Sequence, residues 1–357
     1  MITAQKIYFV SEDEEVFEYA YLNAVGNVNV SGLISDTIKE TKFAIPICSK
    51  KWLFAQDLDN VFIVVADNKE MLNIIKELLK KGLQFVENWI PYWMYNSCEI
   101  SAEKMLQLVG GNKERFANAM NEIKKKKQVI LIHGNCQTHA MRYYLKQNEE
   151  IAKRYVLVEM PQLWNAGHKE KYDKLFDVDI FSYVDILITQ IVSKDNKFAE
   201  RVSTEHILSL VNPECKVITI SNAFFNGYYP QFCNDIKYDK NKVAEVVNEK
   251  GLSLYWGRLD YVVAEKVIEG KSVEEIIESI LDEDFYDRKW LYNYIYNGIN
   301  YTKAKEQNCD IKICEYIESK LNKEILFTTS MHPGENLMVF MRENFGKNRN
   351  KRYFSML

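Results

Sequence analysis

One stretch of the sequence, VILIHGNCQ at residues 129–137, decides the fold of the larger part of the chain. Its four leading apolar residues are typical of a strand that is buried on both faces, as in a parallel sheet. Gly134 and Asn135 permit a sharp turn, and apolar residues then recur at helical spacing through Met141 and Leu145. A strand, a tight turn and a helix in this order predict the first β–α unit of an α/β domain.

Further apolar runs extend this unit into a predicted parallel sheet. We expect strands at residues 155–158, 185–189, 216–220 and 325–327, and helices at residues 262–268, 272–281 and 289–320. Ser272 and Glu275 form the capping-box pattern of a helix start. The sequence therefore predicts a parallel sheet flanked by helices over residues 128–357.

The first 95 residues show a second α/β pattern. We expect strands at residues 7–10, 28–34, 61–65 and 85–86, and a helix at residues 71–79 that ends at Gly82. Ser11 and Glu14 resemble a capping box for a helix after the first strand. This alternation predicts a Rossmann-like half-domain over residues 1–95. The polar residues 96–127 end in four lysines and are interpreted as a helical linker.

A nucleotide-binding role for residues 1–95 is one interpretation, with Asp36 holding a ribose. The glycine fingerprint of dinucleotide-binding domains is missing, however, and the acidic stretch at residues 11–15 would repel a pyrophosphate. We therefore favour a scaffold or oligomerisation domain, which would make the protein a homo-oligomer.

Composition limits the classes of function. The 357 residues are enough for about two domains. A net charge of -4 argues against a nucleic-acid partner, because such surfaces need a basic excess. No apolar run approaches the ~20 residues that span a bilayer, no signal-peptide pattern opens the chain, and the seven cysteines include no C-x-x-C pair. A cytoplasmic protein is expected. The basic residues 347–352 are interpreted as a solvated tail, with a peripheral membrane contact as the alternative.

Polar side chains follow the predicted strands of the second domain. Ligands of open parallel sheets bind outside the carboxyl ends of the strands. The residues at these positions are small, polar or able to transfer protons: Gly134, Asn135, Cys136, Gln137, Gln190, Ser221, Asn222 and His332. We therefore expect the functional site at this edge of the sheet.

Cys136 and His332 are the predicted catalytic residues. Cys136 falls at the start of a predicted helix, where the partial positive charge favours the thiolate and backbone N–H groups can hold an oxyanion. His332 precedes Pro333 in a predicted loop and is the candidate general base. The string formed by His133, Cys136 and His139 suggests a metal as an alternative, but it lacks a fourth ligand, so no metal is expected.

Four segments together resemble the WcbI-like polysaccharide biosynthesis family. They are the stretch at residues 129–137, residues 185–190, the aromatic segment at residues 221–230 and the His-Pro pair that starts at His332. The resemblance covers about residues 128–345 and leaves the N-terminal domain outside. It implies an SGNH-like fold with coenzyme A, or acetyl-CoA, as cofactor. It also places Cys136 at the nucleophile position and His332 at the base position. SGNH enzymes usually carry an Asp three residues before the His, where this chain has Thr329.

The function that we expect is transfer of an acetyl or similar group from acyl-CoA to a hydroxyl of a surface polysaccharide or of a nucleotide-sugar precursor. Gly134, Asn135, Gln137, Gln190, Ser221 and Asn222 would position the thioester or its oxyanion. Tyr228 and Tyr229 would stack on a sugar or adenine, or would only pack their loop. An SGNH-type glycan esterase is one alternative. A non-catalytic CoA- or nucleotide-binding subunit of a polysaccharide assembly complex is the other.

Overall fold

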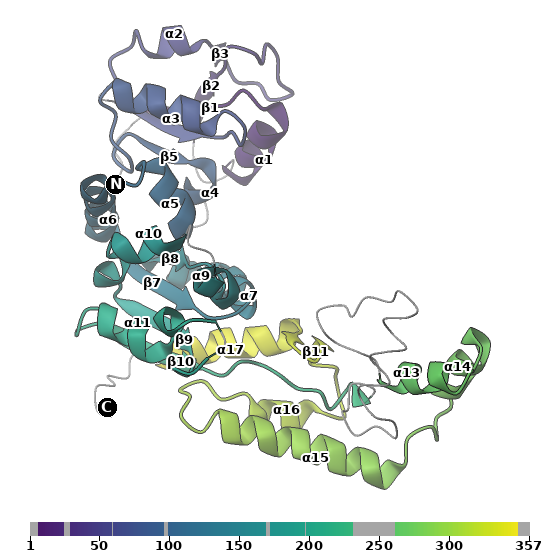
Figure 1. Cartoon of the computed structure of the whole chain (residues 1–357). Helices are drawn as coiled ribbons and strands as arrows, with labels where there is room; N and C mark the ends of the chain where they lie inside the picture. The colour runs from purple at the N-terminus through teal and green to yellow at the C-terminus, as the bar shows by residue number, and fades with distance from the viewer. Residues whose placement is uncertain are drawn as a thin grey trace. The chain divides into compact units, whose positions relative to one another are not determined.

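The structure is a computed structural model, and it describes residues 6–24, 29–58, 60–95, 99–168, 172–196, 198–230 and 261–348 (Figure 1). Two compact units divide the chain, the first running to Ile218 and the second spanning Thr219–Asn348. The division falls inside residues 128–357, which the sequence predicted as one catalytic domain. In the part of the chain described, no helix is both long and apolar enough to cross a membrane.

The first sheet has the strand order β3-β2-β1-β4-β5, and all its pairs are parallel. Its strands are β1 (Lys6–Val10), β2 (Val30–Ile34), β3 (Ile47–Cys48), β4 (Val61–Val65) and β5 (Trp89–Pro91). Its helices are α1 (Glu14–Ala24), α2 (Lys50–Leu53), α3 (Met71–Lys80) and α4 (Tyr92–Tyr95). The α/β alternation predicted for residues 1–95 is confirmed.

Two details of this half-domain differ from the prediction. Ser11 does not cap helix α1, because its hydroxyl bonds the backbone of Asp13, and the Asp13 carboxylate accepts the Val16 N–H instead. The expected strand at residues 85–86 is also wrong. Val86 has a φ of 71°, which interrupts an extended chain, and β5 begins only at Trp89.

The second sheet has the strand order β10-β9-β7-β8-β6. Its strands are β6 (Glu99–Ser101), β7 (Gln128–His133), β8 (Tyr155–Glu159), β9 (Ile186–Gln190) and β10 (Lys216–Ile220). The helices of this part are α5 (Ala102–Leu108), α6 (Lys113–Lys126), α7 (Gln137–Lys146), α8 (Glu149–Arg154), α9 (Leu163–His168), α10 (Asp173–Asp177) and α11 (Thr204–Leu210), with short 3-10 turns η2 (Ile180–Tyr183) and η3 (Glu200–Val202). The predicted parallel strands at β7, β8, β9 and β10 are confirmed.

The predicted helical linker, residues 96–127, contains a strand as well as helices. Strand β6 pairs in parallel with β8, and Ile100 at its centre is buried. Only three residues long, it is too short to show a periodicity in the sequence. This stretch therefore supplies an edge of the second sheet, and helices α5 and α6 follow it.

In its described residues, 219–230 and 261–348, the second unit consists mainly of helices. They are α13 (Tyr261–Ile268), α14 (Val273–Ile280), α15 (Arg288–Lys305), α16 (Cys314–Lys320) and α17 (Glu335–Asn348). The capping box of Ser272 and Glu275 is confirmed at the start of α14. The expected fifth parallel strand at residues 325–327 is wrong, because β11 (Phe327–Thr329) pairs antiparallel with β12 (His332–Pro333) in a separate hairpin. The fifth strand of the second sheet is β6.

Both parallel sheets reverse their strand order at one central strand. β1 lies between β2 and β4, and β7 lies between β8 and β9. At such a switch point the connections leave in opposite directions, which opens a crevice outside the carboxyl ends of the strands. The sheet topology therefore favours ligand binding at one turn in each sheet. This is the turn after β1 in the first sheet and the turn after β7 in the second.

Candidate functional site

The turn after β7 places Cys136 at the start of helix α7. Cys136 occupies the N-cap position, and its side chain is exposed. The first N–H groups of a helix have no partner within the helix, and they carry the positive end of its dipole. The Cys136 sulfur is therefore exposed beside the positive end of the α7 dipole.

Three amide side chains hold this turn together. The Gln190 carbonyl oxygen accepts the Asn135 N–H at 2.9 Å, and its amide nitrogen donates to the Asn135 and Gln137 side-chain oxygens at 3.1 and 3.2 Å. The Asn135 side chain also accepts the Gln137 N–H at 3.0 Å. Gln190 and Gln137 are buried, so these bonds connect the end of β9 to the inner side of the turn.

Gly134 allows the close approach of this network. A Cβ atom at Gly134 would lie 2.7 Å from the Gln190 side-chain oxygen and 2.8 Å from the Thr138 methyl carbon. Both distances are below van der Waals contact, so a larger residue would push Gln190 away. Gly134 was predicted to contact a cofactor. In the structure, the absence of a side chain at Gly134 leaves room for the Gln190 side chain.

His133 is buried at the end of β7 and contacts the end of β9. Thr189 gives its single hydroxyl proton to the Gln190 carbonyl, so the His133 Nδ1–H is the donor in the 3.0 Å bond to Thr189 Oγ1. Burial lowers the pKa of His133 to about 4, against a smaller opposite effect from the Val202 backbone. His133 is therefore neutral at pH 7 and connects two strands.

A charged cluster covers the neighbouring face of α7. Arg142 contacts Glu99 at 3.0 Å and also Glu159, which pairs with His139 as well. Burial alone would raise the pKa of Glu159, but His139 and Arg142 lower it. Glu159 was not among the residues expected from the sequence, although it follows an apolar run as Gln190 does. In the described residues no three His, Cys, Asp or Glu side chains form a metal-binding group, and His133 and His139 are engaged elsewhere.

In the second unit, His332 has a partner that the sequence left unidentified. Thr329 Oγ1 lies 2.7 Å from His332 Nδ1, and Thr328 Oγ1 donates to the His332 carbonyl at 3.1 Å. Thr329 and His332 are paired residues of the β11–β12 hairpin. The hydroxyl of the residue three positions before His332 thus contacts a nitrogen of its ring.

The aromatic segment after β10 is bound to the same part of the chain. The Tyr228 and Tyr229 hydroxyls donate to the Glu324 and Phe327 carbonyls at 3.2 and 2.8 Å. Burial raises the pKa of both phenols. The contacts favour the packing role that we considered for these tyrosines over a role in stacking on a ligand.

Two more residues of the predicted site lie at the start of this segment. Ser221 is buried, and its hydroxyl donates to the Asn222 carbonyl at 3.3 Å. Farther along, the Phe225 N–H donates to the Ser330 carbonyl at 2.9 Å. The segment after β10 is thereby tied to the turn of the β11–β12 hairpin. His332 lies in strand β12 of this hairpin and not in the loop that was predicted, because it pairs with Thr329.

The structure thus brings the predicted residues together in two groups. Gly134, Asn135, Cys136, Gln137 and Gln190 form one group in the first unit. In the second unit, Ser221, Asn222, Tyr228 and Tyr229 share the segment after β10, and a hydrogen bond ties that segment to the β11–β12 hairpin, which contains His332. The pairing of Cys136 with His332 connects different units and stays a prediction.

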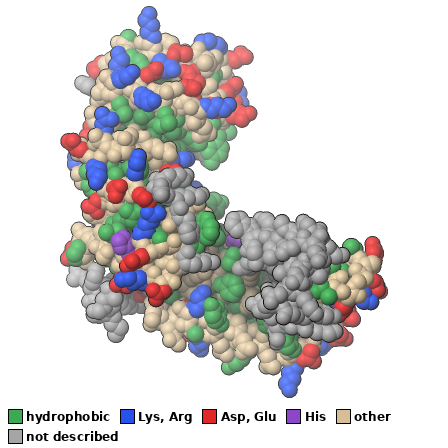
Figure 2. Space-filling model, in the orientation of Figure 1, with side chains coloured by type: hydrophobic (Ala, Val, Ile, Leu, Met, Phe, Trp, Pro, Cys, Tyr) green, Lys and Arg blue, Asp and Glu red, His purple; other side chains and the backbone are tan. Residues whose placement is uncertain are grey.

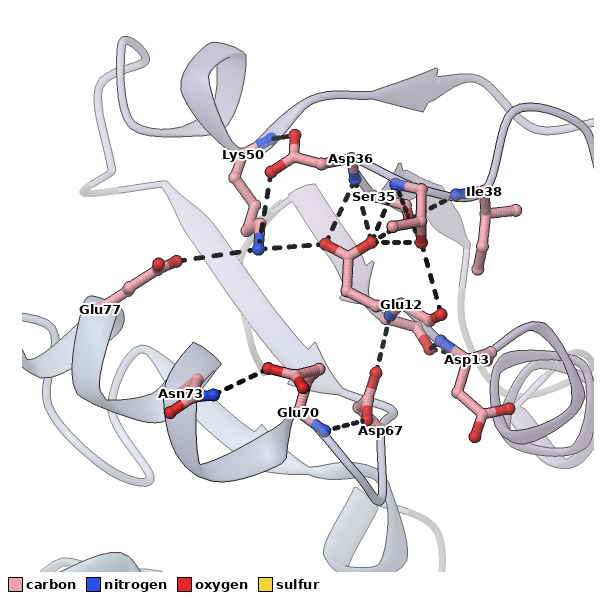
Figure 3. A network of polar contacts seen from close by, with 12 residues as sticks. Glu12, Asp13, Ser35, Asp36, Ile38, Lys50, Asp67, Glu70, Asn73 and Glu77 are labelled. Atoms are coloured by element: carbon pink, nitrogen blue, oxygen red, sulfur yellow. Dashed lines mark hydrogen bonds and ion pairs between the residues drawn. The ribbon is translucent and has the colours of Figure 1, made fainter.

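The turn after β1 holds a carboxylate where a nucleotide phosphate would lie in a dinucleotide-binding domain (Figure 3). The Glu12 carboxylate accepts the Ser35 hydroxyl at 2.8 Å, the Thr37 hydroxyl at 2.6 Å and the Thr37 N–H at 2.9 Å, and Lys50 lies 3.0 Å away. Burial alone would raise the pKa of Glu12, but Thr37, Ser35, Lys50 and the Asp36 N–H lower it to about 2.

Asp36, the residue considered for a ribose, belongs to the same network. Its carboxylate accepts the Lys50 N–H at 3.1 Å and lies 3.5 Å from the Lys50 ammonium. Across the turn, Asp67 accepts the N–H groups of Glu12 and Glu70, both at 2.7 Å. The polar groups at this edge bind one another, which supports the scaffold interpretation of residues 1–95.

A cavity of about 940 Å³ lies elsewhere in the first unit. Its walls include Phe85 and Trp89 near β5, and Arg115, Glu122 and Lys125 on α6. No residue of the predicted site lines this cavity, and its charges are of both signs. It therefore adds nothing to the chemistry at Cys136.

Comparisons with known proteins agree on the larger part of the chain. The sequence model of a family described as polysaccharide biosynthesis enzyme WcbI matches residues 129–345. A solved structure of WcbI, in its native form without a disulfide bond between CoA and a cysteine, is similar with a TM-score of 0.50 and 18% sequence identity. The match covers 64% of this chain and 71% of that one, and it shows a shared fold. No curated protein matches the chain.

Proposed function

Because the chain belongs to the WcbI family of polysaccharide biosynthesis enzymes, we propose that it transfers an acyl group from acyl-CoA to a hydroxyl of a glycan or nucleotide sugar. The observation that carries this proposal is the exposed Cys136 at the start of α7, held by the amide network of Gln190. The solved relative, a native form of WcbI without a disulfide bond between CoA and a cysteine, supports CoA as the ligand. Since acyl-CoA is the donor, we place the reaction in the cytoplasm.

Cys136 would form a covalent intermediate. Its thiolate attacks the carbonyl carbon of the acyl-CoA, a new C–S bond forms, and the bond to CoA breaks. CoA leaves as a thiolate and takes up a proton. The positive end of the α7 dipole would stabilise the oxyanion of the intermediate. The Gln137, Thr138 and His139 N–H groups already donate within the turn, so they fix its geometry.

His332 would then activate the acceptor. The acceptor hydroxyl attacks the thioester carbon, its proton passes to His332 Nε2, and the Cys136 sulfur leaves and is protonated. This role requires the other ring nitrogen, Nδ1, to carry a hydrogen, which Thr329 Oγ1 is placed to accept. Thr329 thus acts as a positioning residue for the base.

The amides of Asn135, Gln137 and Gln190 have a different role from the one first expected. They form hydrogen bonds with one another and with the backbone of the turn. We assign them to fixing the backbone before α7 in the geometry that the oxyanion needs, because a catalytic geometry is lost when its supporting groups move.

The test is the intact mass of the full-length chain after incubation with acetyl-CoA, with free CoA measured in parallel. We expect an acetyl adduct that maps to Cys136 and is absent from Cys136→Ala. The buried Cys215 gives a matched control, since Cys215→Ala should keep the adduct. An adduct on another residue, or CoA release that continues in Cys136→Ala, would contradict the thioester route.

A non-catalytic CoA-binding subunit is the second candidate, and Thr329 is the observation that favours it. A neutral hydroxyl stabilises a protonated imidazole less than the carboxylate of a full triad does. In this case CoA raises the melting temperature of wild type, while neither an adduct nor hydrolysis is detected with a glycan acceptor present. Hydrolysis of glycan esters without CoA would instead identify an esterase.

A further inference from the structure

Helix α15 (Arg288–Lys305) presents an uncharged surface in a chain where 27% of residues are charged. No charged residue occurs in the twelve positions from Leu291 to Thr302. Every exposed residue of this stretch is a tyrosine or an asparagine: Tyr292, Asn293, Tyr296, Asn297, Asn300 and Tyr301. An ordinary solvated helix face is rich in Lys, Arg, Glu and Asp, so this face is unlike one.

Five of these residues form a continuous stripe, which we call the Tyr/Asn face. At 100° per residue, Tyr292, Asn293, Tyr296, Asn297 and Asn300 fall within one side of the helix and extend about 12 Å along it. The residues Tyr292 and Tyr296 are 73% and 63% exposed. In Figure 2 the lower edge of the molecule, where Figure 1 draws α15, is mainly tan and green, with blue and red side chains toward its ends.

A ladder of aromatic rings borders this face. Tyr286 and Trp290 stack with their centroids 5.6 Å apart and their planes at 11°, and Trp290 and Tyr294 stack at 5.2 Å and 12°. Trp290 and Tyr294 follow the four-residue spacing of one side of α15, and Tyr286 lies just before the helix. They hold one another in fixed orientations, which lowers the entropy that ligand binding would cost.

The opposite side of α15 packs against the segment that follows β10. Ile299 and Thr302 are buried, and Thr302 Oγ1 lies 3.4 Å from the Phe224 carbonyl. A Cβ on Gly298 would lie 3.3 Å from the Phe225 ring. Since Phe225 in turn bonds Ser330, the helix is anchored to the β11–β12 hairpin, which contains His332, within the second unit.

From this composition we infer that the Tyr/Asn face binds a neutral glycan chain, the acceptor of the proposed transfer. Tyrosine rings offer a flat apolar surface to the C–H faces of sugars, with a hydroxyl at the rim. Asparagine amides both donate and accept hydrogen bonds, as sugar hydroxyls do. The inference names the acceptor class and in that sense rests on the proposed function, but the binding itself needs no acyl transfer.

Other occupants fit this face less well. A nucleic acid needs basic residues, and the stripe from Tyr292 to Asn300 has none. Exposed aliphatic side chains, which a protein or membrane surface would use, are gathered instead on or beside the neighbouring α14 at Val273, Ile277, Ile280 and Leu281. The two helices of one unit thus separate an aliphatic surface from an aromatic and amide surface.

The test is retardation of the full chain in native gels cast with single neutral polysaccharides: amylose, β-1,3-glucan, galactomannan, xylan and mannan. We expect at least one to retard wild type. The double variant Tyr292→Ala/Tyr296→Ala should raise the Kd about tenfold or more. Tyr292→Phe/Tyr296→Phe should keep most of the binding, because the rings remain. Ile277→Ala on α14 is the matched control and should bind as wild type.

Three results would overturn the inference. They are the absence of retardation by every polysaccharide, equal retardation of the double alanine variant, and a change in oligomeric state of that variant without a change in glycan binding. The acetyl adduct at Cys136 is measured on the same proteins. Glycan binding that is lost while the adduct remains supports the inference, whereas a missing adduct in wild type with glycan binding intact overturns only the proposed function.

Discussion

The turns after β1 and β7 occupy equivalent places in their sheets and have opposite chemistry. Each follows a central strand at which the strand order reverses. After β1, the Glu12 carboxylate binds the hydroxyls, N–H groups and ammonium that an anionic ligand would use. After β7, the polar groups of Gln190 and Asn135 hold the turn from behind, while Cys136 is exposed. The same topology thus gives a closed edge in one sheet and an open edge in the other.

The difference shows that a reversal of strand order is not sufficient for a ligand-binding site. Whether a ligand can bind depends on whether the residue after the strand fills the crevice or leaves it open. Glu12 reaches back to the end of β2 and to Lys50 and satisfies five donors, so the first sheet gains stability at this edge. In the described part of the chain the Cys136 side chain has no set of partners of that kind, so the second sheet keeps an exposed thiol after β7.

Replacement of Cys136 tests the open edge and should have the largest effect. We expect Cys136→Ala to lower acyl transfer by ~10³ or more, because the nucleophile is lost. The free energy of unfolding should change by less than about 0.5 kcal/mol, since the side chain is exposed. Initial rates with acetyl-CoA and urea unfolding measure the two quantities. A rate within twofold of wild type would leave Cys136 without a catalytic role.

Replacement of Gln190 tests the support behind the thiol. Gln190→Leu removes three hydrogen bonds to the turn and should lower the rate by about 10², because a displacement of about 1 Å at a catalytic group has this cost. Gln147→Leu, at an exposed position beyond the end of α7, is the control and should behave as wild type. Equal rates for both variants would show that the network does not position Cys136.

Replacement of Glu12 tests the closed edge. The lowered pKa corresponds to about 3 kcal/mol of stability at pH 7, which Glu12→Gln should largely remove. In wild type this contribution is present above pH 4.5 and is lost as the pH falls toward 2, because protonation of the carboxyl then favours the unfolded chain. Urea unfolding at several pH values measures it. Full stability of Glu12→Gln, or a comparable loss of acyl transfer, would contradict the assignment.

His133 gives the second sheet a different acid sensitivity. Its pKa in the folded chain, about 4, lies below the ordinary value of about 6.5, so the unfolded chain binds the proton more readily between these values. Stability should be complete above pH 6.5 and fall by about 2 kcal/mol at pH 5. Hydrogen exchange, corrected for intrinsic rates, should rise in β7 and β9 before it rises in β1. The reverse order would exclude His133 as the cause.

Thr329 should have the smallest effect of these positions. Thr329→Val removes the hydroxyl at His332 Nδ1 and should lower kcat about tenfold through misorientation of the ring, with the KM for acyl-CoA unchanged. Thr329→Ser keeps the hydroxyl and should restore most of kcat. A rise in KM with kcat unchanged would point to a binding role instead.

Local patterns were sufficient for most of the fold. The buried runs at β1, β4, β7 and β9 are apolar enough to be recognised without a structure, because a strand covered on both faces tolerates few polar residues. Strand β6 was not predicted, because a stretch of three residues shows no periodicity in the sequence. The predicted strand at residues 85–86 was wrong because the positive φ of Val86 depends on the neighbouring turn. The predicted parallel strand at residues 325–327 was wrong because β11 pairs with β12, in which His332 follows its partner Thr329 by only three residues.

The candidate site was predictable in its members and less so in their roles. The rule that ligands bind at the carboxyl ends of strands selected Asn135, Cys136 and Gln190 correctly as neighbours. The rule could not show that Gln190 bonds the turn, or that the Tyr228 and Tyr229 hydroxyls bind carbonyls farther along the chain. Hydrogen-bond partners more than 50 residues apart leave no local mark in the sequence.

The two α/β patterns, the tight turn at Gly134 and the uncharged Tyr/Asn stretch of α15 follow from the sequence alone, because each depends only on residues close together in the chain. The folded structure was needed to show that Glu12 closes the first sheet, that Gln190 supports the second turn and that Thr329 contacts His332. In the first two of these, side chains from different strands share one edge of a sheet. In all three, the pairing of hydrogen-bond donors with acceptors depends on the tertiary fold.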